Sequence, residues 1–244
     1  MAAWHQQPWQ TYAQQELERQ ANRRLPPSRA ALARRTAATV ALALVGMALP
    51  LVVLTTCGTP AYAADQIPRA ALQHRGTLKR EAQRVLGLNA PVASFAAQIH
   101  QESRWRHDAR SPVGAIGMAQ FMPATAKWIG GMDRELATRD PMNPAWAVRA
   151  LVVYDKWLWD RVTAVDACNR MAFAMAAYNG GLGWTNKRKA RSPQPGICFG
   201  ATCAINPGIH PANQRENQHY PEVILKRYEP LYANTIGWGP GVCQ

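Results

Sequence analysis

The chain has few acidic residues for its length. Its 244 residues include 28 Lys and Arg but only 15 Asp and Glu, which gives a formal net charge of +13. Such a balance suits polyanionic partners: nucleic acids, anionic lipids or the acidic polymers of a bacterial envelope. The basic residues are scattered, however, and no helix-turn-helix, zinc-finger or RNA-recognition signature accompanies them. We therefore expect no nucleic-acid partner, and charge alone selects no other.

The sequence also lacks alternating polar and apolar stretches of useful length, and it lacks internal repeats. Helical periodicity recurs instead. We expect an all-α fold with at most a small hairpin, in a single globular domain over residues 77–235 that follows a linker (57–76) and precedes a tail (236–244). The expected helices cover 77–86, 91–105, 123–129, 143–162, 168–178 and 216–232, with Pro221 marking the true start of the last one. Residues 187–212 are rich in Pro, Gly and Cys, so we expect a stapled loop.

One long apolar run lies near the N-terminus. Residues 36–56 carry no charge and can cross a bilayer once, which takes about 20 apolar residues. The basic segment 1–35 precedes the run, so its end is expected in the cytoplasm and the remainder in the periplasm. Ala61-Tyr62-Ala63 resembles a signal-peptidase site, which favours cleavage, whereas the long leader favours a retained anchor. A single-pass protein of the bacterial inner membrane and a periplasmic protein cleaved near Ala63 both remain open.

Five cysteines agree with export. Cys57 ends the apolar run and only loosely resembles a lipidation site. The other four are an even set, for which disulfides are the expected state in an oxidising compartment: Cys168, Cys198, Cys203 and Cys243. They permit three pairings, and the sequence does not choose among them. A zinc site is the alternative, but Cys198 and Cys203 have no second close pair beside them.

A carboxylate stands on an apolar helical face within residues 91–105. Val92, Phe95, Ile99 and Trp105 recur near the spacing of one face, and Glu102 lies three residues from each of the last two. Burial raises the pKa of a carboxyl because it disfavours the charged form, and a raised pKa suits a general acid at neutral pH. We expect Trp105 to pack near this acid. The alternative is a surface glutamate at the end of a helix.

Three blocks of residues follow one another in a fixed order. The first holds Gln101-Glu102-Ser103-Arg104-Trp105, then Ala109, Ser111, Gly114-Ala115, Gly117, Gln120-Phe121-Met122-Pro123 and Thr125-Ala126; the second is Ala177-Tyr178-Asn179-Gly180-Gly181; the third is Glu216-Asn217-Gln218-His219-Tyr220, with Val223 and Tyr228 beyond. With these blocks the chain resembles the soluble lytic transglycosylases (SLT domain, family 1 type) of the goose-lysozyme-like superfamily, from about Leu78 to Tyr232. Two positions depart from the family pattern. Asn217 stands where Thr is usual, and Gly117-Met118-Ala119-Gln120 replaces Gly-Leu-Met-Gln, an exchange expected to tune the groove near the cleaved bond.

The resemblance implies a lysozyme-like fold with little or no sheet and an enzyme that uses no metal or cofactor. The implied reaction cleaves the β-1,4 bond between N-acetylmuramic acid and N-acetylglucosamine in peptidoglycan strands and leaves a 1,6-anhydro sugar. Glu102 matches the family's single catalytic acid/base, and one carboxyl suffices because the sugar's own 6-hydroxyl is the nucleophile. The positions implied to bind substrate are Ser103, Gln120, Met122, Tyr178, Asn179, Glu216 and Tyr220, with the Tyr220 hydroxyl directed at Glu102.

Two other functions remain open. A hydrolytic muramidase, such as a lysozyme or phage endolysin, needs a second carboxylate. Asp108, Asp133 and Asp140 are the candidates, and loop or helix-cap duty is the alternative for each. The other function is a non-catalytic wall-docking component of a secretion, conjugation or phage entry apparatus. The expected partners are thus peptidoglycan strands, the membrane through residues 36–56, and such a machine.

Overall fold

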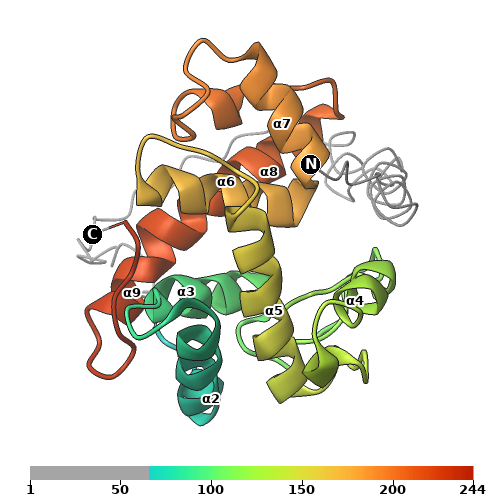
Figure 1. The fold of residues 1–244 in the computed structure, drawn as a ribbon, viewed down its shortest axis with the longest axis vertical. Coiled ribbons are helices and arrows are strands. Elements are labelled where there is room, and N and C mark those ends of the chain that lie inside the picture. The colour runs from blue at the N-terminus through green and yellow to red at the C-terminus, as the bar shows by residue number, and fades with distance from the viewer. Residues whose placement is uncertain (1–65, 244) are drawn as a thin grey trace, which may run out of the picture. The chain divides into compact units, whose positions relative to one another are not determined.

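The computed structural model describes residues 66–243 (Figure 1). The basic segment 1–35, the apolar run 36–56, Cys57 and the Ala61-Tyr62-Ala63 site lie outside the described residues, so the expectations about them stay predictions. Among the described helices, none combines the length and the apolar character that a membrane crossing requires.

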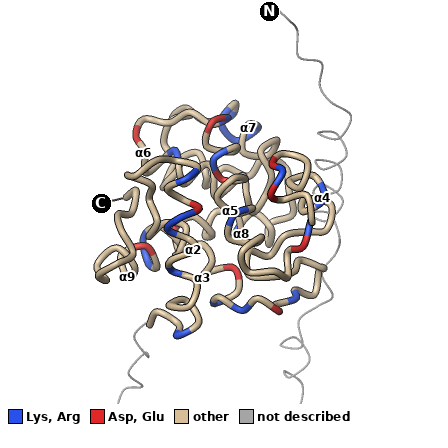
Figure 2. Tube along the Cα trace, turned by 60° about the horizontal axis from the view of Figure 1, so that its bottom comes forward, with Lys and Arg blue, Asp and Glu red and all other residues tan. Residues whose placement is uncertain are grey.

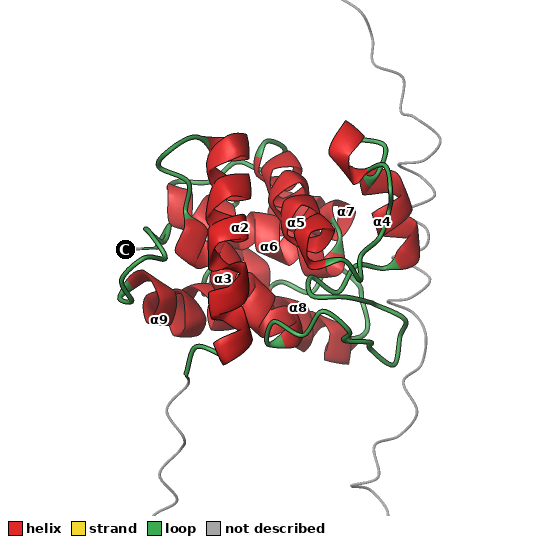
Figure 3. Cartoon of the chain, turned by 90° about the horizontal axis from the view of Figure 1, so that it is seen from below, coloured by secondary structure: helices red, strands yellow, loops and turns green. Residues whose placement is uncertain are grey.

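Helices provide nearly all the regular structure of residues 66–243, as Figure 3 shows. In chain order they are α2 (Arg69–Leu86), α3 (Val92–Ser103), α4 (Pro123–Ile129), the 3₁₀ turn η2 (Arg134–Leu136), α5 (Pro144–Trp159), α6 (Ala167–Gly180), α7 (Leu182–Arg191), the 3₁₀ turn η3 (Thr202–Ala204), α8 (Pro211–Glu222), the π-helix η4 (Val223–Tyr228) and α9 (Glu229–Ala233). Strand-type pairing in this part of the chain is limited to isolated bridges from Ile116 to Arg110 and to Phe121. The expected all-α fold is confirmed.

Two helices form the centre of the core. Every side chain of α3 from Val92 to His100 is buried, and so is every side chain of α6 from Met171 to Ala177. α3 packs against α2, η4 and α9, whereas α6 packs against α5, α7 and α8, an arrangement that can be followed in Figure 1. The small alanine side chains that recur in both helices let their neighbours approach closely. The expected central helix at 168–178 is confirmed.

Polar caps fix where the helices around this centre begin. The Asn143 side chain accepts hydrogen bonds from the N–H groups of Ala145 and Trp146, and Pro144 follows it in the first turn of α5. The Asp166 carboxylate accepts the Asn169 N–H at 2.7 Å and starts α6. These contacts satisfy N–H groups that have no partner inside the helix. α5 ends at Trp159, three residues before the expected residue 162.

Charged side chains are interspersed along the fold (Figure 2). Arg149 of α5 binds Glu81 of α2 at 2.6 Å and Asp133, the residue before η2, at 2.5 Å. Arg84 of α2 pairs with Glu135 of η2. These contacts join α2, α5 and η2 at one place.

Helix α2 begins well before the expected position. It starts at Arg69 rather than at residue 77, so the expected linker is helical from residue 69 onward. Ala71 and Leu78, seven residues apart, are both fully buried, which shows that the first two turns face the core on the same side as the rest. Arg69 is exposed and Arg75 is half-buried, so the charged residues of this stretch interrupt its apolar pattern.

The last helical region differs most from expectation. It starts at Pro211, and Pro221 lies inside α8 instead of marking its start. A proline cannot donate a helical hydrogen bond. Directly after it the chain adopts the π-helix η4, whose hydrogen bonds span one residue more than those of an α-helix. Residues 211–233 are therefore helical without a break. The expected loop 187–212 is also wrong at its start, because α7 continues to Arg191.

The expected tail 236–244 belongs, as far as residue 243, to the core. Trp238 is fully buried against the rings of Trp105 and Tyr232, at centroid distances of 5.7 and 4.8 Å. The Glu229 carboxylate accepts the Cys243 N–H at 2.8 Å. The domain boundary placed at residue 235 is therefore wrong, because a buried tryptophan beyond it completes the packing.

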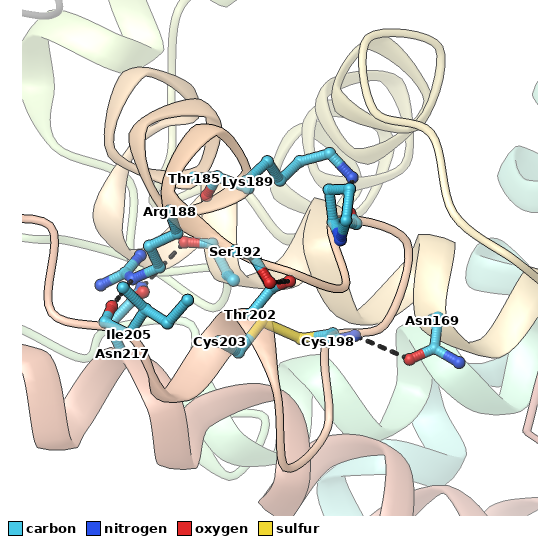
Figure 4. Close-up of a disulfide and its surroundings, with 12 residues drawn as sticks. Asn169, Thr185, Arg188, Lys189, Ser192, Cys198, Thr202, Cys203, Ile205 and Asn217 are labelled. Carbon is cyan, nitrogen blue, oxygen red and sulfur yellow. Dashed lines mark hydrogen bonds between the residues drawn. A yellow bond between two sulfur atoms is a disulfide. The ribbon is translucent and has the colours of Figure 1, made fainter.

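The four described cysteines form two disulfides, Cys168–Cys243 and Cys198–Cys203. The first joins the start of α6 to the C-terminal segment. The second closes a short turn between α7 and α8, and Figure 4 shows the Cys198 N–H donating to the Asn169 side chain of α6 at 2.9 Å. Because Cys198 and Cys203 are bonded to each other, the zinc alternative for this pair is wrong.

Candidate active site

A cleft of about 290 Å³ opens beside the C-terminal end of α3. Its walls come from α3, the loop between α3 and α4, and helices α4, α5, α6 and α8. The lining residues are Glu102, Ser111, Val113, Ala115, Gln120, Phe121, Met122, Thr125, Tyr154, Tyr178, Asn179 and Glu216. Six of the residues expected from the sequence are therefore brought together here: Glu102, Gln120, Met122, Tyr178, Asn179 and Glu216.

Glu102 lines this cleft with a pKa raised to about 8. Burial is the main cause of the rise, a hydrogen bond from Tyr220 opposes it, and the nearby Glu216 carboxylate adds to it. The Tyr220 hydroxyl, on α8, donates to Glu102 Oε1 and lies behind the lining of the cleft. At neutral pH the Glu102 carboxyl is therefore mostly protonated and can donate a proton.

The chain turns sharply just after this acid. α3 ends at Ser103, and Arg104 and Trp105 adopt left-handed conformations with φ of 53° and 66°. The turn directs the Trp105 ring into the core against Tyr232, whose hydroxyl accepts the indole N–H at 2.7 Å. Trp105 therefore does not continue the α3 face, and its expected packing beside the acid stays a prediction.

The loop after the turn is held mainly through its backbone. Ser103 Oγ donates to the Met118 carbonyl, and Tyr178 Oη donates to the Ala119 carbonyl, each at 2.7 Å. The side chains of Met118 and Ala119 are buried and do not line the cleft. The exchange at these two positions therefore changes side chains buried beneath the loop, and its expected effect on the groove near the cleaved bond stays a prediction.

Gly117 allows this loop to pass close to the segment before α5. Its φ is 79°, and a Cβ at this position would stand 1.8 Å from the Pro141 carbonyl oxygen. Gln120, also left-handed with φ of 49°, donates its side-chain N–H to the Gly117 carbonyl at 2.8 Å. The Gln120 side-chain N–H thus stabilises the loop that places Gln120 at the cleft.

A chain of amides joins α6 to α8 at the edge of the cleft. Asn217 Nδ2 donates to the Ala176 carbonyl and to Asn179 Oδ1, each at 2.8 Å. Asn179 in turn donates to Glu216 Oε1 at 3.2 Å. Gly180 makes room for this contact, since a Cβ there would stand 2.4 Å from Asn217 Nδ2. Asn217, the departure from the family pattern, is buried and positions Asn179 and, through it, Glu216.

The three aspartates considered as second carboxylates lie outside the cleft lining. Asp133 accepts the Glu135 N–H and binds Arg149, and Asp140 accepts the Met142 N–H at 3.2 Å. Asp108 is exposed on the loop. The alternatives of loop or helix-cap duty are confirmed for these two: Asp133 caps η2, and Asp140 holds a turn in the loop before α5.

Tyr154 and Asp155 of α5 are the main residues that sequence reasoning missed. Tyr154 lines the cleft, and Asp155 is buried, with Gln98 Nε2 of α3 3.4 Å from its Oδ1. A single acidic residue inside the run Leu-Val-Val-Tyr-Asp-Lys-Trp-Leu-Trp was the available signal. Trp128 and Trp157 pack edge to face at 4.9 Å and do not line the cleft.

No group of three or more His, Cys, Asp or Glu side chains in residues 66–243 is arranged to hold a metal ion.

The family model described as "Transglycosylase SLT domain" matches residues 84–197. Residues 84–197 are thus similar to a transglycosylase SLT domain. The resemblance read from the three blocks is thus confirmed.

Several curated proteins are similar to part of the chain. Proteins named membrane-bound lytic murein transglycosylase F are 37% identical over 90 residues in Vibrio parahaemolyticus, 36% over 90 in Pasteurella multocida and 30% over 104 in Shewanella pealeana. These matches cover 36%, 36% and 42% of the chain. They cover only 16%, 17% and 20% of the relatives' own lengths.

A solved structure shares the fold. It is an inactive Glu-to-Gln mutant of the lytic transglycosylase Slt from Pseudomonas aeruginosa, with a TM-score of 0.56 and 25% identity. The match covers 75% of this chain and 28% of that protein. The fold around the cleft is therefore the lysozyme-like fold of a lytic transglycosylase.

Proposed function

We propose that the SLT domain cleaves the β-1,4 bond between N-acetylmuramic acid and N-acetylglucosamine in peptidoglycan without water, and that it leaves a 1,6-anhydro-muramic end. The observation that carries the proposal is Glu102, a carboxyl that lines the cleft with a pKa of about 8. The relatives named lytic murein transglycosylases support the substrate class.

Glu102 acts twice in the proposed reaction. It first gives its proton to the glycosidic oxygen as the bond from the muramic C1 to that oxygen breaks. As a carboxylate it then removes the proton of the muramic 6-hydroxyl while O6 bonds to C1. The proton passes from O6 to the leaving oxygen through one carboxyl, so the balance needs neither water nor a second acid. The Tyr220 hydroxyl, which donates to Glu102 Oε1, stabilises the carboxylate between the two steps.

The other lining residues are proposed to hold the glycan. Gln120 and Met122 contribute the loop side of the cleft, and Tyr178 and Asn179 contribute the end of α6. Amide and hydroxyl groups suit sugar hydroxyls and acetamido groups, and a methionine offers an apolar surface. Ser103 is assigned a supporting role, because its hydroxyl donates to the Met118 carbonyl.

A hydrolytic muramidase is the second candidate, because Glu216 places another carboxylate in the lining. In a hydrolase such a group activates water or forms a covalent intermediate. Glu216 is exposed and accepts a hydrogen bond from Asn179 at 3.2 Å. We assign it to substrate binding and to raising the pKa of Glu102. A non-catalytic wall-docking role is disfavoured by the protonated acid in the cleft.

We further propose that the protein works on the periplasmic side of the inner membrane. The relatives carry the description "membrane-bound", and residues 36–56 supply an uncharged run of adequate length. The formal charge of +13 favours adsorption to an acidic cell wall. The protein could instead be cleaved near Ala63, or act as part of a secretion, conjugation or phage entry apparatus. Either alternative would change the location of the domain but not the reaction that it catalyses.

Product analysis tests the proposed reaction. The full chain is incubated with purified peptidoglycan, and the soluble muropeptides are identified by mass spectrometry. We expect anhydro-muropeptides from the wild type and from Glu222→Gln, a matched change on α8 outside the cleft lining, and none from Glu102→Gln. Products with hydrated reducing ends would establish the muramidase, and the absence of any product would leave wall docking.

A further inference from the structure

Two buried side chains beneath the cleft each have one oxygen without a partner. Asp155 of α5 is 1% exposed and Gln98 of α3 is fully buried. Gln98 Nε2 donates to Asp155 Oδ1 at 3.4 Å, whereas Asp155 Oδ2 and Gln98 Oε1 are buried without a hydrogen-bond partner. An ionised carboxylate can only accept hydrogen bonds, so it cannot satisfy the amide oxygen. Two buried acceptors without hydrogen-bond partners are costly.

A proton on Asp155 Oδ2 gives both of these oxygens a hydrogen-bond partner. The carboxylic acid then has an O–H that donates to Gln98 Oε1, while the Gln98 N–H donates to Asp155 Oδ1. The acid and the amide become complementary donor–acceptor pairs and close a ring of two hydrogen bonds. The two atoms that lack partners are the two that this second hydrogen bond joins.

The pair lies directly beneath the proposed catalytic acid. Gln98 precedes Glu102 by four residues in α3, so the two share one face, one turn apart. Asp155 follows Tyr154, which lines the cleft. We propose that Asp155 is held as a neutral carboxylic acid paired with Gln98, and that this pair is a positioning device that fixes α3 against α5 under Glu102. The functional part of this inference rests on the proposed reaction.

The surroundings of Asp155 favour the neutral form. The titratable groups that act on it or are acted on by it are Glu102 on α3, Tyr154 beside it, Tyr178 on α6 and Tyr220 on α8, and none of them is a cation. Burial raises the pKa of Asp155 well above its ordinary value, Glu102 raises it further, and the Gln98 hydrogen bond opposes the rise. Because Asp155 is neutral, replacing it by Asn removes no charge and should leave the charge state of Glu102 unaltered.

Unfolding measurements test the protonation state without reference to activity. A raised folded-state pKa means that, above the ordinary pKa of about 4, the unfolded chain has released a proton that the folded protein retains. The wild type then loses stability as the pH rises, whereas Asp155→Asn keeps both hydrogen bonds and does not titrate. We expect the ratio of the unfolding constants, wild type over Asp155→Asn, to increase about tenfold per pH unit between pH 5 and 7.

The matched control is Asp160→Asn, which changes an exposed aspartate just after α5 that pairs with Lys156 and should not reproduce the tenfold rise. A constant ratio for Asp155→Asn would overturn the proposal, because it would mean that Asp155 is ionised in the folded protein. If Asp155→Asn does not fold, the double variant Gln98→Leu/Asp155→Leu replaces both partners by apolar groups. It should give the same tenfold rise.

Turnover then tests the positioning role. Asp155→Leu leaves the Gln98 amide unpaired, so we expect kcat for anhydro-muropeptide release to fall at least tenfold, with rescue in Asp155→Asn. The alkaline limb of the pH profile should not move to lower pH in Asp155→Asn. Such a move would show that a negative charge had been removed beside Glu102, and equal kcat in Asp155→Leu would refute positioning. If the wild type forms no anhydro product, the proposed reaction fails while the unfolding test still decides the protonation state.

Discussion

Loss of the hydrogen bond from Tyr220 to Glu102 should raise the pKa of Glu102. Burial raises the pKa of Glu102 to about 8 although this hydrogen bond lowers it. Tyr220→Phe keeps the buried ring and removes only the donor. A hydrogen bond to a charged group contributes about 1.5–3 kcal/mol, and 1.36 kcal/mol corresponds to one pKa unit. The pKa of Glu102 should therefore rise by about one to two units.

Two consequences are measurable in one pH series. The proton donor is lost above its pKa, so the alkaline limb of kcat/KM for anhydro-muropeptide release should move upward by about one to two units in Tyr220→Phe. The plateau rate should fall by about 10- to 100-fold, because the carboxylate between the two steps loses its charge-assisted donor. Tyr232→Phe, which removes a buried hydroxyl bonded to Trp105 and His100, is the control and should leave the limb in place.

An alkaline limb of kcat/KM that is unchanged or shifted to lower pH in Tyr220→Phe would refute this reasoning. It would mean that Tyr220 does not favour the ionised form of Glu102. A lowered plateau without any shift of the limb would assign Tyr220 to substrate contact alone.

Three further changes have definite expected outcomes. Glu216→Gln removes a charge that raises the pKa of Glu102, so the alkaline limb of the pH–rate profile should move to lower pH; an upward shift would contradict this electrostatic role. Replacing both Cys168 and Cys243 by Ser releases a link across 75 residues, and chemical denaturation should show a loss of about 4 kcal/mol in the free energy of unfolding, whereas a loss near zero would mean that the link is not formed. Gly117→Ala would place a Cβ 1.8 Å from a backbone carbonyl oxygen, so the melting temperature and kcat should both fall, and unchanged values would show that the loop moves freely.

The sequence was sufficient for the parts of the fold that local patterns determine. The apolar run Met-Ala-Phe-Ala-Met-Ala-Ala predicted the buried helix α6, because only a central helix can bury residues on all sides. Asn143-Pro144 marked the start of α5, since the cap and the proline are both local signals. The three sequence blocks contain most of the residues that line the cleft.

Features that depend on contacts distant in sequence were not accessible in this way. The left-handed turn at Arg104 and Trp105 sends the Trp105 ring to the C-terminal segment, which no periodicity shows. Trp238 joins the core across more than a hundred residues, so its segment was mistaken for a tail. The role of Asp155 was hidden because its partner, Gln98, lies on another helix. The pairing of the cysteines needed the same long-range information.

The most direct test of the account is the identity of the sugar end that the protein leaves on peptidoglycan. Muropeptides released by the full chain at pH 7 are separated and weighed by mass spectrometry, with Glu102→Gln run beside the wild type. The account predicts 1,6-anhydro-muramic ends from the wild type and their loss in Glu102→Gln. Hydrated reducing ends from the wild type, or anhydro products that persist in Glu102→Gln, would contradict it.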